Sequence, residues 1–203
     1  MFFVYFVVNS FLMKLRSFLA FELSGPLKES LRQVSQDLKK TSLDAKWVKI
    51  DNIHLTVIFL GDIEEQWLNQ MDIAARATCS LFAPFAVSLK SMGCFPNKKK
   101  ARVLWLGLAG DLGRMADFQK TLQKGLNPLN VKKEDREFKP HLTLGRFRTP
   151  GNQGQLLDTI LRQYQDLTSP VMPLTELVLF KSDLKPGGAE YPKLRSWPLS
   201  GAK

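Results

Sequence analysis

The chain has 203 residues, of which 44% are hydrophobic and 24% are charged, and these values are ordinary for a soluble globular protein with a buried core. The net charge of +10 is not ordinary, and it favours a polyanionic partner such as nucleic acid or a phosphorylated substrate. Cys79 and Cys94 have neither a CxxC pattern nor metal-ligand spacing, which argues against a zinc site and favours reduced thiols in a cytoplasmic protein.

The first twelve residues differ from the rest of the chain because they are mostly apolar and carry no charge. They lack the basic segment and the small cleavage-site residues of a secretory signal, and they are too short to span a bilayer as a helix. Met13 begins a segment that is typical of a natural protein start. We therefore expect residues 1–12 to be an extension outside the fold and residues 13–203 to form one bilobal domain, without stable membrane association. A membrane-associating tail is the alternative.

The pattern of apolar residues predicts two similar series of elements. The first series is strand, helix, strand, helix, strand over residues 16–22, 27–40, 53–60, 64–81 and 84–91. The second has the same order over residues 102–108, 112–126, 141–147, 153–164 and 171–180, and a last strand is expected over 191–199 after a Lys-Pro-Gly-Gly turn. Two landmarks recur at one offset, since 141 − 54 = 87 and 102 − 15 = 87. This repetition predicts a half-domain that has been duplicated and fused.

Both histidines of the chain occur in the same short phrase. His54-Leu55-Thr56-Val57 lies in the first series and His141-Leu142-Thr143-Leu144 in the second. In a strand, His and Thr at positions i and i+2 share one face, while the residues between them point to the other. Since imidazole exchanges protons near neutral pH, two such units could flank one reacting group, with one histidine giving a proton and the other taking one. This is the arrangement needed for in-line displacement at phosphorus without a metal.

A lone histidine on a strand is more often structural than catalytic, and a repeated HxT can arise by chance. The paired occurrence is the stronger signal, because it includes every histidine in the chain and has Thr at the same offset both times. The sequence has no glycine-rich phosphate loop, no HExxH and no aspartate-rich metal site, so we expect neither a cofactor nor a metal.

Two further basic features are candidates for contact with phosphate. Lys98, Lys99 and Lys100 lie between two predicted strands, where a solvated hairpin tip is the simpler interpretation, although they could touch a nucleic-acid backbone. Arg146 follows His141 by five residues, so on an undistorted strand it would lie on the opposite face. A bulge or a twist at the strand end could still turn its guanidinium toward the histidine and make it a phosphate ligand.

The phrases around the two motifs resemble those of the two-histidine phosphoesterase superfamily, and in particular those of RNA 2′,3′-cyclic phosphodiesterases, also called 2′-5′ RNA ligases. The resemblance covers about residues 14–199 and includes the segments 47–48, 52–61, 95–96, 102–107, 138–144 and 182–194. Gly145 departs from the expected bulkier residue and leaves the aim of Arg146 open. The resemblance implies an α+β fold of duplicated β-α-β-α-β halves with pseudo-twofold symmetry, in which two antiparallel sheets face a central groove.

The resemblance also implies hydrolysis of RNA 2′,3′-cyclic phosphate ends to 2′-phosphomonoesters, and we expect the protein to be a monomer. It assigns His54 as the proton donor and His141 as the proton acceptor, while the sequence by itself cannot tell these roles apart. Thr56 and Thr143 would donate hydrogen bonds to the phosphate oxygens, and unidentified aromatic side chains would stack the bases. Two alternatives stay open: ligation of RNA ends in the reverse direction, and a basic RNA-binding module with two structural histidines.

Overall fold

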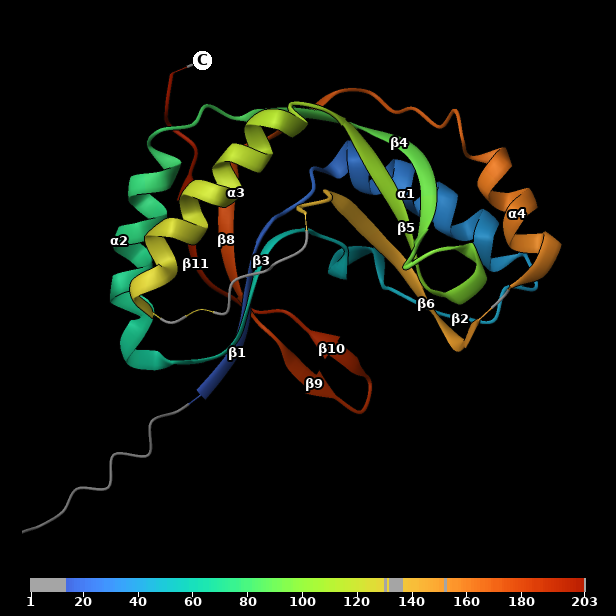
Figure 1. Ribbon diagram of the computed structural model, residues 1–203, viewed down its shortest axis with the longest axis horizontal. Coiled ribbons are helices and arrows are strands. Elements are labelled where there is room, and N and C mark those ends of the chain that lie inside the picture. Colours follow the sequence, from blue (N-terminus) through green and yellow to red (C-terminus); the bar gives the residue numbers. More distant parts are fainter. Residues whose placement is uncertain (1–13, 130, 132–136, 152, 203) are drawn as a thin grey trace, which may run out of the picture.

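The computed structural model describes residues 14–129, 131, 137–151 and 153–202. The expected extension over residues 1–12 therefore lies outside the described residues. The described part is an α+β structure with helices on two sides of a pair of sheets (Figure 1). The helices are α1 (Gly25–Lys39), α2 (Leu68–Cys79), α3 (Leu112–Leu126) and α4 (Gly154–Gln163). Short 3-10 turns cover Ile50–Asn52, Glu65–Trp67, Lys98–Lys100 and Asn127–Leu129.

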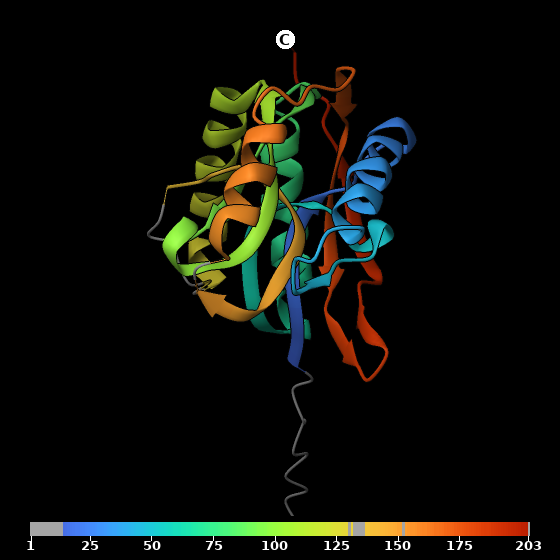
Figure 2. The same cartoon turned by 90° about the vertical axis from the view of Figure 1, so that its right-hand side faces the viewer.

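Two antiparallel sheets form the centre of the molecule. The first sheet has the order β11-β8-β1-β3, with bounds Lys193–Pro198, Glu176–Lys181, Lys14–Phe21 and Leu55–Glu64. The second has the order β2-β6-β5-β4-β7, with bounds Ala45–Trp47, His141–Gly151, Ala101–Gly110, Phe85–Phe95 and Met172–Leu174. A hairpin of β9 (Asp183–Lys185) and β10 (Gly188–Glu190) projects from one end of the molecule in both views (Figures 1 and 2).

The helices lie on the outer sides of the two sheets. Helices α2 and α3 lie beside the first sheet, and α1 and α4 lie beside the second (Figure 1). Each helix turns a stripe of leucine or other apolar side chains inward, as Leu27, Leu31 and Leu38 do in α1. These side chains join one apolar cluster that includes residues from both sheets.

The two halves exchange strands. Strand β4 follows the first HxT segment along the chain, yet it pairs with β5 of the second half. Strand β8 follows the second HxT segment, yet it pairs with β1 of the first half. Each sheet therefore contains strands from both halves, and each sheet holds one of the two histidine segments.

The strand registers confirm the pseudo-twofold relation between the two halves. They also correct the number of residues that separates two of the equivalent strands. The pairs Phe18↔Phe59 and Val103↔Arg146 are equivalent, as are Phe180↔Phe18 and Phe95↔Val103. The histidine strands β3 and β6 keep the expected offset, since 146 − 59 = 87, whereas β1 and β5 differ by 103 − 18 = 85. The 87-residue spacing of Leu15 and Arg102 was thus wrong by two residues for these strands, because similar strand openings in the sequence do not fix the register.

Several predicted boundaries differ from the observed ones for physical reasons. Gly61 was expected to end a strand, but β3 continues through it, because its φ of +71° lets the chain bulge there. The strand expected over 171–180 is two strands in different sheets, because the chain crosses between sheets at Thr175. The helix expected over 64–81 begins only at Leu68, after a 3-10 turn. Strand β2 and the β9–β10 hairpin were not predicted, since three-residue strands leave no readable periodicity.

Candidate active site

The two histidines are held in the same way. His54 directly precedes β3 and His141 is the first residue of β6, and both side chains are partly buried. The Nδ1 atom of His54 lies 2.9 Å from the carbonyl oxygen of Asn52, and that of His141 lies 2.7 Å from the carbonyl oxygen of Lys139. A carbonyl oxygen can only accept a hydrogen bond, so Nδ1 is the protonated nitrogen of each neutral ring. The Nε2 atoms are therefore left to take up or release the exchangeable proton.

Aromatic side chains fix the orientation of both imidazole rings. The ring of His54 stacks on Phe18 with a centroid separation of 4.4 Å, and the ring of Tyr191 meets it edge-on at 5.3 Å. The ring of His141 meets Phe95 edge-on at 4.9 Å. Phe18 belongs to a small buried cluster with Ala20, Val178 and Phe180, separate from the main core. The ring of His54 packs against this cluster through its contacts with Phe18 and Phe180.

The register places each threonine on the same face as its histidine. In β5, Gly107 lies opposite His141 and Trp105 opposite Thr143, and alternate residues of a strand share a face. We call this the inner face of the second sheet. Thr56 lies on the equivalent face of the first sheet, opposite Ala20. Both threonine side chains are partly exposed, and neither hydroxyl has a hydrogen-bond partner among the described residues. Both hydroxyls are therefore available to a bound group.

A bulge brings Arg146 onto this inner face. The pairing of β5 with β6 passes from Gly145 to Thr143 and skips Leu144, so Arg146 lies opposite Val103. Since Val103, Trp105 and Gly107 alternate along one face, Arg146 shares that face with Thr143 and His141. The expectation for an undistorted strand is thus wrong for this site, and the bulged alternative is the one observed. Gly145 lets the ring of Trp47 pack closely beside this part of β6, because a Cβ there would lie 3.0 Å from that ring.

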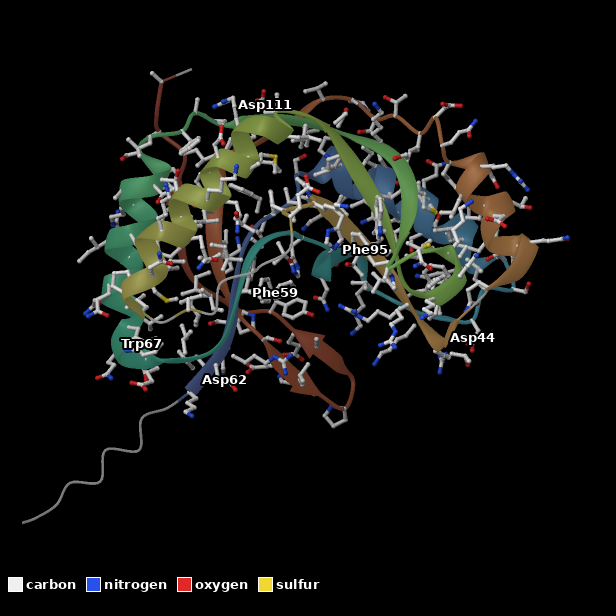
Figure 3. All side chains as sticks on the ribbon, viewed as in Figure 1. Asp44, Phe59, Asp62, Trp67, Phe95 and Asp111 are labelled. Atoms are coloured by element: carbon white, nitrogen blue, oxygen red, sulfur yellow. The ribbon has the colours of Figure 1, made fainter. Side chains whose placement is uncertain are left out.

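The pseudo-twofold counterpart of Arg146 is Phe59. The first sheet has the matching bulge, with Val57 skipped in the pairing, so Phe59 follows Thr56 on one face as Arg146 follows Thr143. The side chain of Phe59 is 65% exposed and projects toward the side on which β6 lies (Figure 3). One half therefore offers a cation at this position, and the other offers an aromatic ring.

The environment favours neutral imidazoles in the free protein. Burial lowers the pKa of His54 from 6.5 to about 4, although the carbonyl of Asn52 opposes this change, and the charge of His141 lowers the pKa further. Burial also lowers the pKa of His141, and the nearby guanidinium of Arg146 adds to this effect. A positive charge on His141 therefore disfavours the charged form of His54, and the charge of Arg146 disfavours that of His141.

The structure has a small hollow beside His54 and a larger one lined in part by Trp105, whose ring lies 6.3 Å from that of His141. The small one of about 80 Å³ is lined by His54, Phe180, Tyr191, Asn52 and the two ion-paired lysines Lys28 and Lys193. The larger one of about 430 Å³ lies along the edge of β4 and is lined by Trp105, Gly93, Cys94 and the basic residues Lys98 and Arg162. Burial raises the pKa of the Cys94 thiol, so this cysteine is not an activated nucleophile.

Sequence reasoning did not single out three residues that lie around the site. The amide of Asn52 donates to the carbonyl of Ala189 over 2.8 Å, which fastens the β9–β10 hairpin to the turn that holds His54. Phe59 could have been found by applying the offset of 87 to Arg146. Lys46 lies directly opposite Arg146 on β2, and no pattern within a three-residue strand could have shown this pairing.

Two observations concern metals and membranes. Within the part of the chain that the structure describes, no three His, Cys, Asp or Glu side chains group as metal ligands would. None of the helices within the described ranges has the length and apolarity needed to cross a membrane.

Comparison with known proteins places the chain in a family. The model of the 2′-5′ RNA ligase superfamily matches residues 26–186. The chain belongs to this superfamily. A relative from Methanothermobacter thermautotrophicus is 31% identical over 92% of this chain and 100% of its own, and one from Methanocaldococcus jannaschii is 31% identical over 90% and 100%. Both of these superfamily members are named RNA 2′,3′-cyclic phosphodiesterase.

Solved structures share the fold of this chain. A Thermus thermophilus protein has 25% identity and a TM-score of 0.78, and the match covers 93% of this chain and 100% of that one. Escherichia coli LigT in complex with 3′-AMP has 21% identity and a TM-score of 0.74 over 93% of this chain and 99% of LigT. The fold class expected from the sequence is thereby confirmed.

Proposed function

We propose that this protein hydrolyses RNA 2′,3′-cyclic phosphate ends to 2′-phosphomonoesters. The observation that supports this most directly is the pair of histidines at equivalent positions, each anchored through Nδ1 to a carbonyl, while neither Nε2 has a hydrogen-bond partner among the described residues. The curated relatives are named for this activity. The proposed reaction needs one proton acceptor and one proton donor, and the two imidazoles supply both.

In this mechanism water attacks phosphorus on the side opposite the 3′ oxygen. Nε2 of His141 accepts a proton from the attacking water as the new P–O bond forms. The bond from phosphorus to the 3′ oxygen breaks, and Nε2 of His54 gives its proton to that oxygen. The product has a 2′-phosphate and a 3′-hydroxyl, and proton exchange with solvent then resets the two histidines.

The role of His54 as donor depends on the substrate. With a pKa of about 4, His54 is neutral in the free protein at neutral pH and has no proton to give. A bound phosphodiester anion stabilises the imidazolium and raises this pKa. Productive binding is therefore coupled to proton uptake, and the pH profile of kcat should lie at higher pH than that of kcat/KM.

Thr56, Thr143 and Arg146 would stabilise the charge that builds on the non-bridging phosphate oxygens. The two threonine hydroxyls are unpaired among the described residues, and they follow the histidines on the inner faces of the two sheets. Arg146 lies near enough to lower the pKa of His141. Preorganised donors at such positions act mainly on the transition state. No step of this mechanism requires a metal or a cofactor, and the substrate partner is RNA or a nucleotide with a cyclic phosphate end.

One observation favours a second function, RNA ligation, and another disfavours a non-catalytic binding module. The family description favours ligation of RNA ends through a 2′-5′ bond, which the same histidines could catalyse in the reverse direction. A binding module with structural histidines is disfavoured, because both imidazoles are partly exposed and electrostatically coupled. A monomeric, cytoplasmic protein remains our prediction.

The test is product identification with a nucleoside 2′,3′-cyclic phosphate, with and without a chelator. We expect the 2′-phosphate as sole product, unaffected by chelation. His54→Ala and His141→Ala should each lower turnover roughly 10²- to 10⁴-fold, the usual range for one acid or base. A 3′-phosphate product, or a folded histidine variant that keeps most of its activity, would contradict the proposal.

A further inference from the structure

A pair of like charges lies directly opposite one another on the inner face of the second sheet. Lys46 of β2 pairs with Arg146 of β6, so their side chains stand next to each other on one face. Both are exposed, and neither has an ion-pair partner among the described residues. Like charges at such cross-strand positions destabilise a sheet, so the pair has a cost that a bound anion would remove.

Two cations near this pair do have acidic partners. Arg148, two residues further along β6, is ion-paired with Asp44 over 3.1 Å, and Asp44 lies beside the end of β6 (Figure 3). Lys98, on the other side of the sheet, is ion-paired with Asp158 over 2.8 Å. Among the described residues, Arg148 and Lys98 are thus ion-paired, whereas Lys46 and Arg146 face each other without an acidic partner.

The position of the pair separates it from the reacting phosphate. Along β5, the residues opposite His141, Thr143 and Arg146 are Gly107, Trp105 and Val103, each two residues apart. Two residues of a strand span about 7 Å. Arg146 is thus about 7 Å beyond Thr143 along the strand direction. Lys46 lies on the neighbouring strand β2, about 5 Å from Arg146 across the sheet. One nucleotide of an extended strand can bridge such a separation.

We infer that Lys46, together with Arg146, binds the phosphodiester that joins the terminal nucleotide of the RNA to its 5′ neighbour. This inference rests on the proposed function and names the substrate class more narrowly: an RNA end of two or more nucleotides is bound in preference to a cyclic mononucleotide. Arg146 bridges the two phosphates, since it also lies near His141, whereas Lys46 serves only the second phosphate.

The experiment compares two substrates: adenosine 2′,3′-cyclic phosphate, which lacks the second phosphodiester, and the dinucleotide ApA with a 2′,3′-cyclic phosphate end, which has it. Lys46→Ala should raise KM for the dinucleotide roughly tenfold, the effect of losing one contact to a charged group, and leave both constants for the mononucleotide unchanged. Lys46→Arg should restore dinucleotide binding. The log–log dependence of kcat/KM on salt for the dinucleotide should become less steep by about 0.7 in Lys46→Ala.

The matched control is Lys124→Ala, which removes an exposed lysine from α3 on the outer side of the first sheet. It should change neither substrate. The mononucleotide also reports folding, since a misfolded variant would lose activity on both. Equal losses on the two substrates in a folded Lys46→Ala variant, or no loss on either, would overturn the inference. Failure of the wild type to hydrolyse either substrate would instead refute the proposed function.

Discussion

The low pKa of His54 has a consequence for the stability of the protein in acid. The pKa of this histidine is 6.5 in a model peptide and about 4 in the folded protein. Below pH 6.5 the unfolded chain therefore binds a proton that the native state does not, and the free energy of unfolding falls. The contribution is fully present above pH 6.5 and is lost as the pH falls from 6.5 to 4.

The size of this effect follows from the shift. One pKa unit corresponds to about 1.4 kcal/mol, so burial of neutral His54 should remove about 3 kcal/mol of stability between pH 7 and pH 4. For a domain with a typical stability of roughly 5–15 kcal/mol, this is a large fraction.

The assay is urea unfolding of the wild type and of His54→Asn from pH 7 to pH 4. Asparagine keeps a donor near the Nδ1 position, where the ring donates to the carbonyl of Asn52, but it does not titrate in this range. We expect the difference in unfolding free energy between wild type and variant to fall by about 3 kcal/mol over the titration. His141→Asn is the control: it removes the charge that lowers the pKa of His54 but leaves the larger effect of burial in place.

Parallel stability curves for wild type and His54→Asn would refute this reasoning, because they would mean that His54 takes up its proton at the same pH in the native and unfolded states. A direct titration of the imidazole by NMR would then have to give a pKa near 6.5.

Three further predictions concern the same site. Thr56→Val and Thr143→Val should each lower kcat by on the order of 10²-fold or less, with a smaller change in KM. Unchanged rates for both variants in steady-state kinetics would show that the threonines only support the strands. The pH profile of kcat should be bell-shaped, with limbs that belong to the coupled histidine pair; a rate that stays flat through the alkaline range would remove the need for a donor. Gly93→Ala should lower the free energy of unfolding by about 1–3 kcal/mol, since its Cβ would lie 2.2 Å from the ring of Trp105, and a urea midpoint equal to that of the wild type would contradict this.

The sequence predicted the parts of the fold that depend on periodicity and repetition. Helix α3 has the predicted bounds of 112–126, because its apolar side chains recur at regular helical spacing. The duplication was visible because the HxT phrase is short, polar and repeated. The residues His54, Thr56, His141 and Thr143 could be named for the same reason.

Other features depend on pairing between distant strands, which periodicity does not encode. The face on which Arg146 lies depends on a bulge at Leu144, and a shift of one residue reverses every side chain beyond it. The pairing of Lys46 with Arg146 joins residues 100 positions apart, since 146 − 46 = 100. The burial of the His54 ring depends on Phe18, Phe180 and Tyr191, which come from three separate segments.

The exchange of strands between the halves means that neither half is an independent folding unit. A fragment ending at Phe95 would contain β1 and β3, but its β4 would lack both of its neighbours, β5 and β7. The remaining fragment would leave β8 without β1. Expressed as separate chains, the two fragments could complete their sheets only by interlocking, and the assembled pair would receive one histidine from each chain. A single ancestral half would have had to meet the same requirement by pairing with a second copy of itself.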